Sequence, residues 1–204
     1  EGTRTGVFVG VMGNEYRERS HDSGALIDVY SESGGARSSA SGRVSHTFGL
    51  TGPAISIDTA CSSSLCAVHY ACESLRSGAA DMAVAGGTNV ILEPESSIAF
   101  SQTGMLAADG RCKFGDASAD GFVRSEGVAV VVLKPLERAK QDGDRIRAVV
   151  RATHVNNDGR SGRGFFLTPS REGQEQLLAS IYGEEGEPAE AVDFVEAHGT
   201  GTGA

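Results

Sequence analysis

The chain has 204 residues, of which 39% are hydrophobic and 28 are glycine, which is typical of a folded α/β protein rather than a disordered chain. Its 18 basic and 27 acidic side chains give a net charge of −9, without any basic block. This charge argues against a surface that binds nucleic acid or an anionic membrane. No apolar run approaches the roughly 18 residues of a membrane span, so no membrane-spanning helix is expected.

The cysteines carry no metal-binding pattern. Cys61, Cys66, Cys72 and Cys112 form no Cys-x-x-Cys pair, and no Cys/His cluster has zinc-site spacing, so no metal is predicted. The first three lie close together on one expected helix, which is a poor geometry for disulfides. Reduced thiols in a cytoplasmic protein are the better interpretation.

The first part of the chain alternates apolar runs with helical patterns. The predicted elements are a strand over 7–11, a helix over 38–48, a strand over 54–57, a helix over 61–77 and a strand over 82–85. Residues 13–36 are polar and read as irregular, with room for some helix. In the helix over 61–77, Leu65, Val68 and Cys72 recur at helical spacing, and Gly78 is suited to end it.

The second part continues the alternation after a long loop. Residues 100–127 are rich in Gly, Asp and Ser, which indicates an extended functional loop. The elements that follow are a buried Val-rich strand over 128–133, a helix over 136–141, a strand over 147–155, a helix over 170–182 with Ser170 as its N-cap, and a strand over 192–196. Alternating strands and helices predict α/β layers.

Cys61 lies where the predicted strand over 54–57 passes through small residues into a helix. The N-terminus of a helix offers unpaired backbone N–H groups and a positive dipole end, and both favour a thiolate. Small neighbours would allow a thioester to approach the sulfur. Cys61 is therefore a candidate nucleophile, with an inert buried cysteine as the alternative. For Cys66 and Cys72 the core interpretation is preferred, and for Cys112 a structural role.

A second candidate site follows the predicted strand over 192–196, where His198 stands in the loop Gly199-Thr200-Gly201-Thr202. A histidine at this place can donate a hydrogen bond to a thioester carbonyl or enolate, or transfer a proton. Thr200 and Thr202 can hydrogen-bond an amide-bearing ligand. Taken alone, a histidine that satisfies a loop carbonyl would be the simpler interpretation.

These motifs together resemble one enzyme family. Residues 58–65 (Asp-Thr-Ala-Cys-Ser-Ser-Ser-Leu) resemble the nucleophile motif of polyketide-type β-ketoacyl synthases, and residues 196–202 (Glu-Ala-His-Gly-Thr-Gly-Thr) resemble the first catalytic-histidine motif of that family. Between them, 110–113, 120–122 and 124–127 match its long central loop. The resemblance covers essentially the whole chain.

The resemblance implies a thiolase-like α/β fold, in which two similar halves stack in five α-β-α-β-α layers, generally as a homodimer. Residues 1–135 would form the N-terminal half, and residues 136–204 would open the C-terminal half. Both ends of the chain read as interruptions within a domain. We expect the 204-residue chain alone to lack condensing activity, because the second histidine, the lysine and the downstream oxyanion loop of the family do not occur in it.

The implied reaction is a decarboxylative Claisen condensation in polyketide biosynthesis. Cys61 would take an acyl chain from an acyl carrier protein that an acyltransferase domain loads, and His198 would act on the malonyl-type extender. Thr200 and Thr202 would contact the phosphopantetheine arm of the carrier. No directly bound cofactor or metal is implied.

Some features depart from the family pattern. The second histidine, a lysine and the downstream oxyanion loop of the family do not occur before Ala204, and the order Phe114-Gly115-Asp116 is unusual. A non-elongating or decarboxylating homologue that binds acyl chains therefore stays open as an alternative. A chain-length-partner scaffold would lack Cys61, and a cysteine hydrolase would not explain the central loop.

Overall fold

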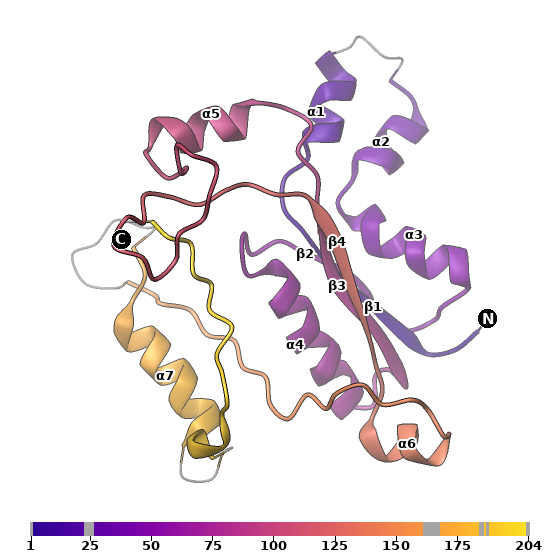
Figure 1. The fold of residues 1–204 in the computed structure, drawn as a ribbon. Helices are drawn as coiled ribbons and strands as arrows, with labels where there is room; N and C mark the ends of the chain where they lie inside the picture. The colour runs from indigo at the N-terminus through magenta and orange to yellow at the C-terminus, as the bar shows by residue number, and fades with distance from the viewer. Residues whose placement is uncertain (1, 23–26, 161–167, 184–185, 187, 203–204) are drawn as a thin grey trace.

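The computed structural model describes residues 2–22, 27–160, 168–183, 186 and 188–202. Its centre is a mixed four-stranded sheet with helices on both faces (Figure 1). The strands are β1 (Thr5–Val11), β2 (Ala54–Ile57), β3 (Met82–Asn89) and β4 (Gly127–Leu133), in the order β2-β1-β3-β4. This arrangement confirms the predicted α/β class.

The sheet is parallel at its centre. β1 pairs in parallel with both β2 and β3, whereas β4 pairs antiparallel with β3. β3 continues to Asn89, beyond the predicted end at Ala85, because its whole length pairs with β1 and β4. Parallel neighbours need a crossover, and helices supply it here.

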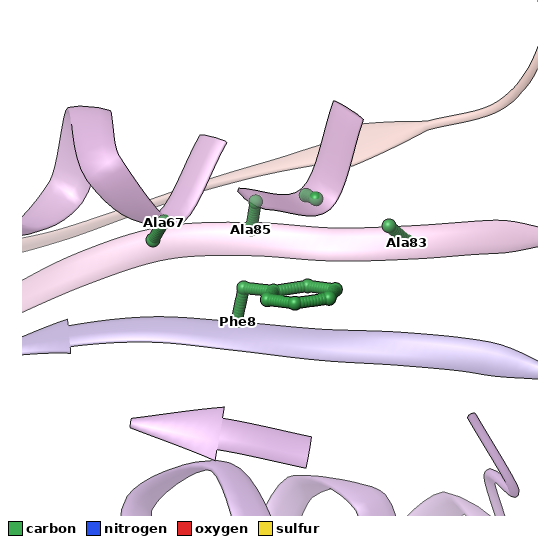
Figure 2. Packing of buried hydrophobic residues seen from close by; sticks show 5 residues of the cluster. Phe8, Ala67, Ala83 and Ala85 are labelled. Carbon is green, nitrogen blue, oxygen red and sulfur yellow. The ribbon is translucent and has the colours of Figure 1, made fainter. Parts of the chain in front are cut away.

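One face of the sheet packs on α4 (Ser63–Arg76), and the buried cluster there is built around Phe8 (Figure 2). Its other members are the small residues Ala67, Ala71, Ala83 and Ala85. Small side chains on both surfaces let the helix lie close to the strands. The opposite face is covered by α3 (Ser38–Phe48), where the hydroxyls of Ser41 and Ser56 lie 2.9 Å apart.

The remaining helices surround this centre. They are α1 (Glu15–Asp22), α2 (Val29–Gly35), α5 (Glu95–Gln102), α6 (Leu136–Gln141), α7 (Arg171–Tyr182) and a short 3₁₀ turn (Ala189–Ala191). The predicted N-cap of α7 is confirmed, because the Ser170 hydroxyl accepts a hydrogen bond of 3.0 Å from the Gly173 N–H. No helix in the described part of the chain combines the length and the apolar character needed to cross a membrane.

Three predictions about elements were wrong. The segments 147–155 and 192–196 form no strand, because neither pairs with another strand among the described residues, and Phe194 is 80% exposed. A strand needs a ladder partner as well as a suitable pattern. The loop predicted over 100–127 begins later than expected, because its first residues belong to α5, which ends at Gln102.

The predicted burial of the strand over 128–133 was also wrong. β4 is an edge strand of the sheet, and Val128, Val130, Val131 and Val132 are exposed. Hydrophobic composition alone cannot separate a central strand from an edge strand, since both are rich in β-branched residues. Val128, Val130 and Val131 line the cavity of the candidate site.

Candidate functional site

Cys61 lies in the tight turn between β2 and α4, and its side chain is exposed. The helix begins at Ser63, so Cys61 precedes it rather than beginning it as predicted. Ala60 has a φ of 56°, in the left-handed region that non-glycine residues rarely adopt. The strand-to-helix junction is thus confirmed, and a strained residue directly before Cys61 turns the chain sharply.

Short side-chain hydrogen bonds hold this turn. The Ser63 hydroxyl donates to the Ala60 carbonyl over 2.6 Å and accepts from the Thr59 N–H over 2.9 Å. The Ser62 hydroxyl donates to the Thr59 carbonyl over 2.8 Å. A run of small hydroxyl residues therefore satisfies backbone groups that a sharp turn leaves without helix or sheet partners.

Asp58 connects the turn to a second segment. One carboxylate oxygen accepts the Ala60 N–H over 3.2 Å, and the other pairs with Arg37 at 2.9 Å. Arg37 also donates to the Gly13 carbonyl over 3.1 Å. The carboxylate thus supports the strained residue directly, and Arg37 links the turn to the chain that follows β1.

The N-terminus of α4 rests on two glycines of neighbouring strands. A Cβ at Gly10 would lie 2.7 Å from the Ser63 carbonyl carbon and from the Ser64 nitrogen. A Cβ at Gly87 would lie 2.8 Å from the Ser64 Cβ. Neither distance is compatible with a real side chain, so both positions require glycine for the helix to approach the sheet this closely.

Cys61 opens on a cavity of about 580 Å³. The walls come from the start of α4, the C-terminal end of β3, the residues before β4 and β4 itself. The lining includes Met12, Leu65, Val68, Val128 and Val130. A predominantly apolar cavity beside a thiol is suited to an alkyl chain attached to that thiol.

The other cysteines differ from Cys61. Cys66 and Cys72 are buried, as predicted, and burial raises the pKa of the Cys72 thiol. Cys112 is exposed, and its Sγ lies 3.4 Å from the carbonyl oxygens of both Gly199 and Thr200. Cys112 thus ties the central loop to the loop that carries His198, and these contacts support the predicted structural role.

The loop of His198 packs on the central loop. The Gly121 N–H donates to the Gly201 carbonyl over 2.9 Å, and the Thr200 and Thr202 hydroxyls lie 2.9 Å apart. His198 itself is exposed. His198, Thr200 and Thr202 are not among the described residues that line the Cys61 cavity. The structure thus brings the two threonines together and leaves His198 outside that cavity.

Sequence reasoning missed one partly buried ion pair. Glu15 and Arg124 lie 3.3 Å apart, with side chains only 14% and 11% exposed. Burial by itself would raise the pKa of Glu15, but the N–H groups of Leu92 and Glu93 and the guanidinium of Arg124 together lower it. Arg124 lies in the recognised motif over 124–127, but Glu15 is 109 residues away from it in sequence, so no local pattern links the two.

The described residues contain no candidate metal site, and His69 makes a structural contact. Among the described residues, no group of three or more His, Cys, Asp or Glu side chains is placed to hold a metal ion. His69 Nδ1 lies 2.9 Å from the Thr153 hydroxyl, which ties α4 to the segment 147–155. His69 therefore acts in packing, as predicted.

The chain matches two family models that together cover most of its length. The profile described as "Beta-ketoacyl synthase, N-terminal domain" matches residues 1–139, and the profile of the C-terminal domain of the same family matches residues 147–204.

Similar proteins include long polyketide synthases. Over 98% of this chain, a phenolphthiocerol/phthiocerol polyketide synthase from Mycobacterium tuberculosis is 49% identical, and the erythronolide synthase EryA2 of Saccharopolyspora erythraea is 46% identical. The chain spans only 13% and 6% of the length of these relatives.

The chain is also similar to solved structures of ketosynthases. The ketosynthase from module 6 of the bacillaene synthase of Bacillus subtilis 168 superposes with a TM-score of 0.89 at 38% identity. The match covers 99% of this chain and 34% of that one. This likeness confirms the predicted thiolase-like fold for the described part.

Proposed function

Because this chain belongs to the β-ketoacyl synthase family, we propose that it supplies the nucleophile of a condensing enzyme in polyketide assembly, with Cys61 as that nucleophile. The observation that supports this role best is the position of Cys61. Its thiol is exposed in a strained strand-to-helix turn and opens on a largely apolar cavity. That combination suits a thiol that accepts and holds an acyl chain.

The proposed chemistry has two transfers. First, Sγ of Cys61 attacks the carbonyl carbon of a carrier-bound thioester, so a new C–S bond forms and the bond to the carrier sulfur breaks. Second, a malonyl-type extender loses carbon dioxide, and the electron pair left on its α-carbon attacks the Cys61 thioester. A C–C bond forms, the C–Sγ bond breaks, and Cys61 is free again.

Further groups of this chain are proposed to assist the two transfers. The backbone N–H of Cys61 is the proposed donor to the oxyanion of each tetrahedral intermediate. His198 is proposed to donate a hydrogen bond to the extender carbonyl as negative charge develops there. Thr200 and Thr202, whose hydroxyls lie 2.9 Å apart, are proposed to contact the phosphopantetheine arm.

The partners follow from the same proposal. The acyl chain and the extender would arrive on an acyl carrier protein, with an acyltransferase domain loading the extender, and the enzyme would act as a cytoplasmic homodimer. We place the division between the two thiolase-like halves after residue 135. The names of the relatives support a place in polyketide synthesis.

The test is acylation of Cys61 in the full natural protein that carries this sequence. Intact-mass and peptide analysis after incubation with an N-acetylcysteamine acyl thioester should show one adduct, on Cys61. The adduct should disappear in Cys61→Ala and persist in Cys112→Ser, which alters the other exposed cysteine. An adduct that survives Cys61→Ala would overturn the assignment.

A further inference from the structure

The partly buried pair of Glu15 and Arg124 joins α1, the stretch from Leu92 through α5, and the end of the central loop, three regions that are distant in sequence. One carboxylate oxygen of Glu15 accepts the N–H groups of Leu92 and Glu93, over 2.6 and 3.0 Å. Arg124 donates to the Ser97 hydroxyl over 2.7 Å, and its guanidinium lies 5.9 Å from the centre of the Phe100 ring. The pair therefore fixes α1, the β3–α5 connection, α5 and the end of the central loop relative to one another.

The residues directly after Arg124 reach the Cys61 cavity. The Ser125 carbonyl accepts a hydrogen bond of 2.6 Å from the Asn89 side chain, and the Glu126 carboxylate accepts the Ile91 N–H over 2.6 Å. Asn89, Ser125 and Glu126 all line the cavity on which Cys61 opens. The position of this wall thus depends on the two connections that the ion pair holds together.

The pair also lies behind that wall. Glu15 and Arg124 line a second cavity of about 300 Å³, which shares Met12, Thr88 and Asn89 with the Cys61 cavity. The shared residues form the partition between the two spaces. A shift of the ion pair would therefore move the partition and change the space beside the thiol, while the turn of Cys61 is held by separate contacts from Asp58 and Ser63.

We propose that Glu15 and Arg124 are positioning residues that determine which acyl chains the Cys61 cavity accepts. This inference rests on the proposed function, because it assigns the cavity to the acyl group held by Cys61. Neither residue touches the thioester. They act through Asn89, Ser125 and Glu126, which they hold in place from behind.

The variants are Glu15→Gln and Arg124→Gln in the full natural protein, with acyl thioesters of two and eight carbons as donors. We expect the rate constant of Cys61 acylation to fall by about tenfold to a hundredfold for the long donor and by less than about twofold for the short one. Arg124→Lys keeps the charge but not the forked donation, so it should restore only part of the selectivity.

Asp81→Asn is the matched control, because it removes the exposed Arg4–Asp81 pair, whose atoms lie 2.6 Å apart. That variant should acylate with both donors as the wild type does. An equal loss with both donors in Glu15→Gln and Arg124→Gln would indicate a general structural role and overturn the inference, and so would unchanged selectivity.

A second measurement separates this inference from the proposed function. Alkylation of Cys61 by N-methylmaleimide and by N-hexylmaleimide requires no acyltransfer chemistry. The ratio of the hexyl to the methyl rate should fall in Glu15→Gln and Arg124→Gln, and a constant ratio would overturn the inference. Wild-type protein that reacts with maleimides but not with thioesters would instead count against the proposed function.

Discussion

Gly10 of β1 and Gly87 of β3 face each other across the parallel ladder, and the first turn of α4 lies on both. Since a Cβ at either position would collide with Ser63 or Ser64, this glycine pair sets how closely the helix approaches the sheet. The height of Cys61 above the sheet therefore depends on two residues that carry no side chain.

Gly10→Ala should test this dependence. The added methyl group would meet the backbone of Ser63 and Ser64, so we expect the free energy of unfolding to fall by about 1–3 kcal/mol and the turn of Cys61 to shift. Urea unfolding measures the first effect, and the alkylation rate of Cys61 measures the second. Gly42→Ala is the control, because it lies inside α3 with open space around its Cβ and should stabilise by about 0.5–1 kcal/mol.

Ala60→Gly should relieve the strained turn. The left-handed conformation of Ala60, with a φ of 56°, is unfavourable for alanine and ordinary for glycine. After the entropy that glycine adds to the unfolded chain is subtracted, we expect a gain of about 0.5–1 kcal/mol in unfolding free energy. Chemical denaturation measures the gain, and a loss of stability would show that the turn stores no strain at this residue.

Glu15→Gln should reveal that the Glu15 carboxylate makes a pH-dependent contribution to the free energy of unfolding. The pKa of Glu15 is lowered in the folded protein, so its charged form stabilises the fold above the ordinary value of 4.5, and this stabilisation is lost as the pH falls toward the lowered value. At neutral pH we expect the variant to be less stable by about 1–3 kcal/mol, because a partly buried charged hydrogen-bond network is weakened.

Urea unfolding from about pH 7 to about pH 3 measures this effect. The difference in unfolding free energy between wild type and Glu15→Gln should be constant near neutral pH and should shrink at acidic pH. Arginine side chains keep their charge over this whole range, so the change reports on the carboxylate of the pair. A difference that grows as the pH falls would contradict the lowered pKa.

His198→Ala should separate the two proposed transfers. If His198 acts on the extender, acylation of Cys61 should continue at nearly the wild-type rate, whereas condensation should fall by about a hundredfold or more. Intact-mass analysis follows the first step, and product formation from a malonyl thioester follows the second. His154→Ala, which changes another exposed histidine, should affect neither. Loss of acylation in His198→Ala would reassign this residue to activation of the nucleophile.

The sequence by itself determined the local architecture around Cys61. An apolar run, a turn of small residues and a helical period are all short-range patterns, and their order predicted a thiol at a strand-to-helix junction. The N-cap at Ser170 was predicted for the same reason, since a cap depends on residues within one turn. The motifs also led to the family, which the profile matches confirm.

Only the tertiary structure decided the relationships that depend on distant partners. The segments 147–155 and 192–196 have strand-like sequences but pair with no strand in the part of the chain that the structure describes, because pairing requires a neighbour that composition cannot specify. In the sequence, Glu15 is one of several acidic residues in a polar stretch, and only the fold places Arg124 beside it. Burial and long-range pairing are properties of the packed chain, so the wall of the Cys61 cavity and the ion pair behind it emerge only after folding.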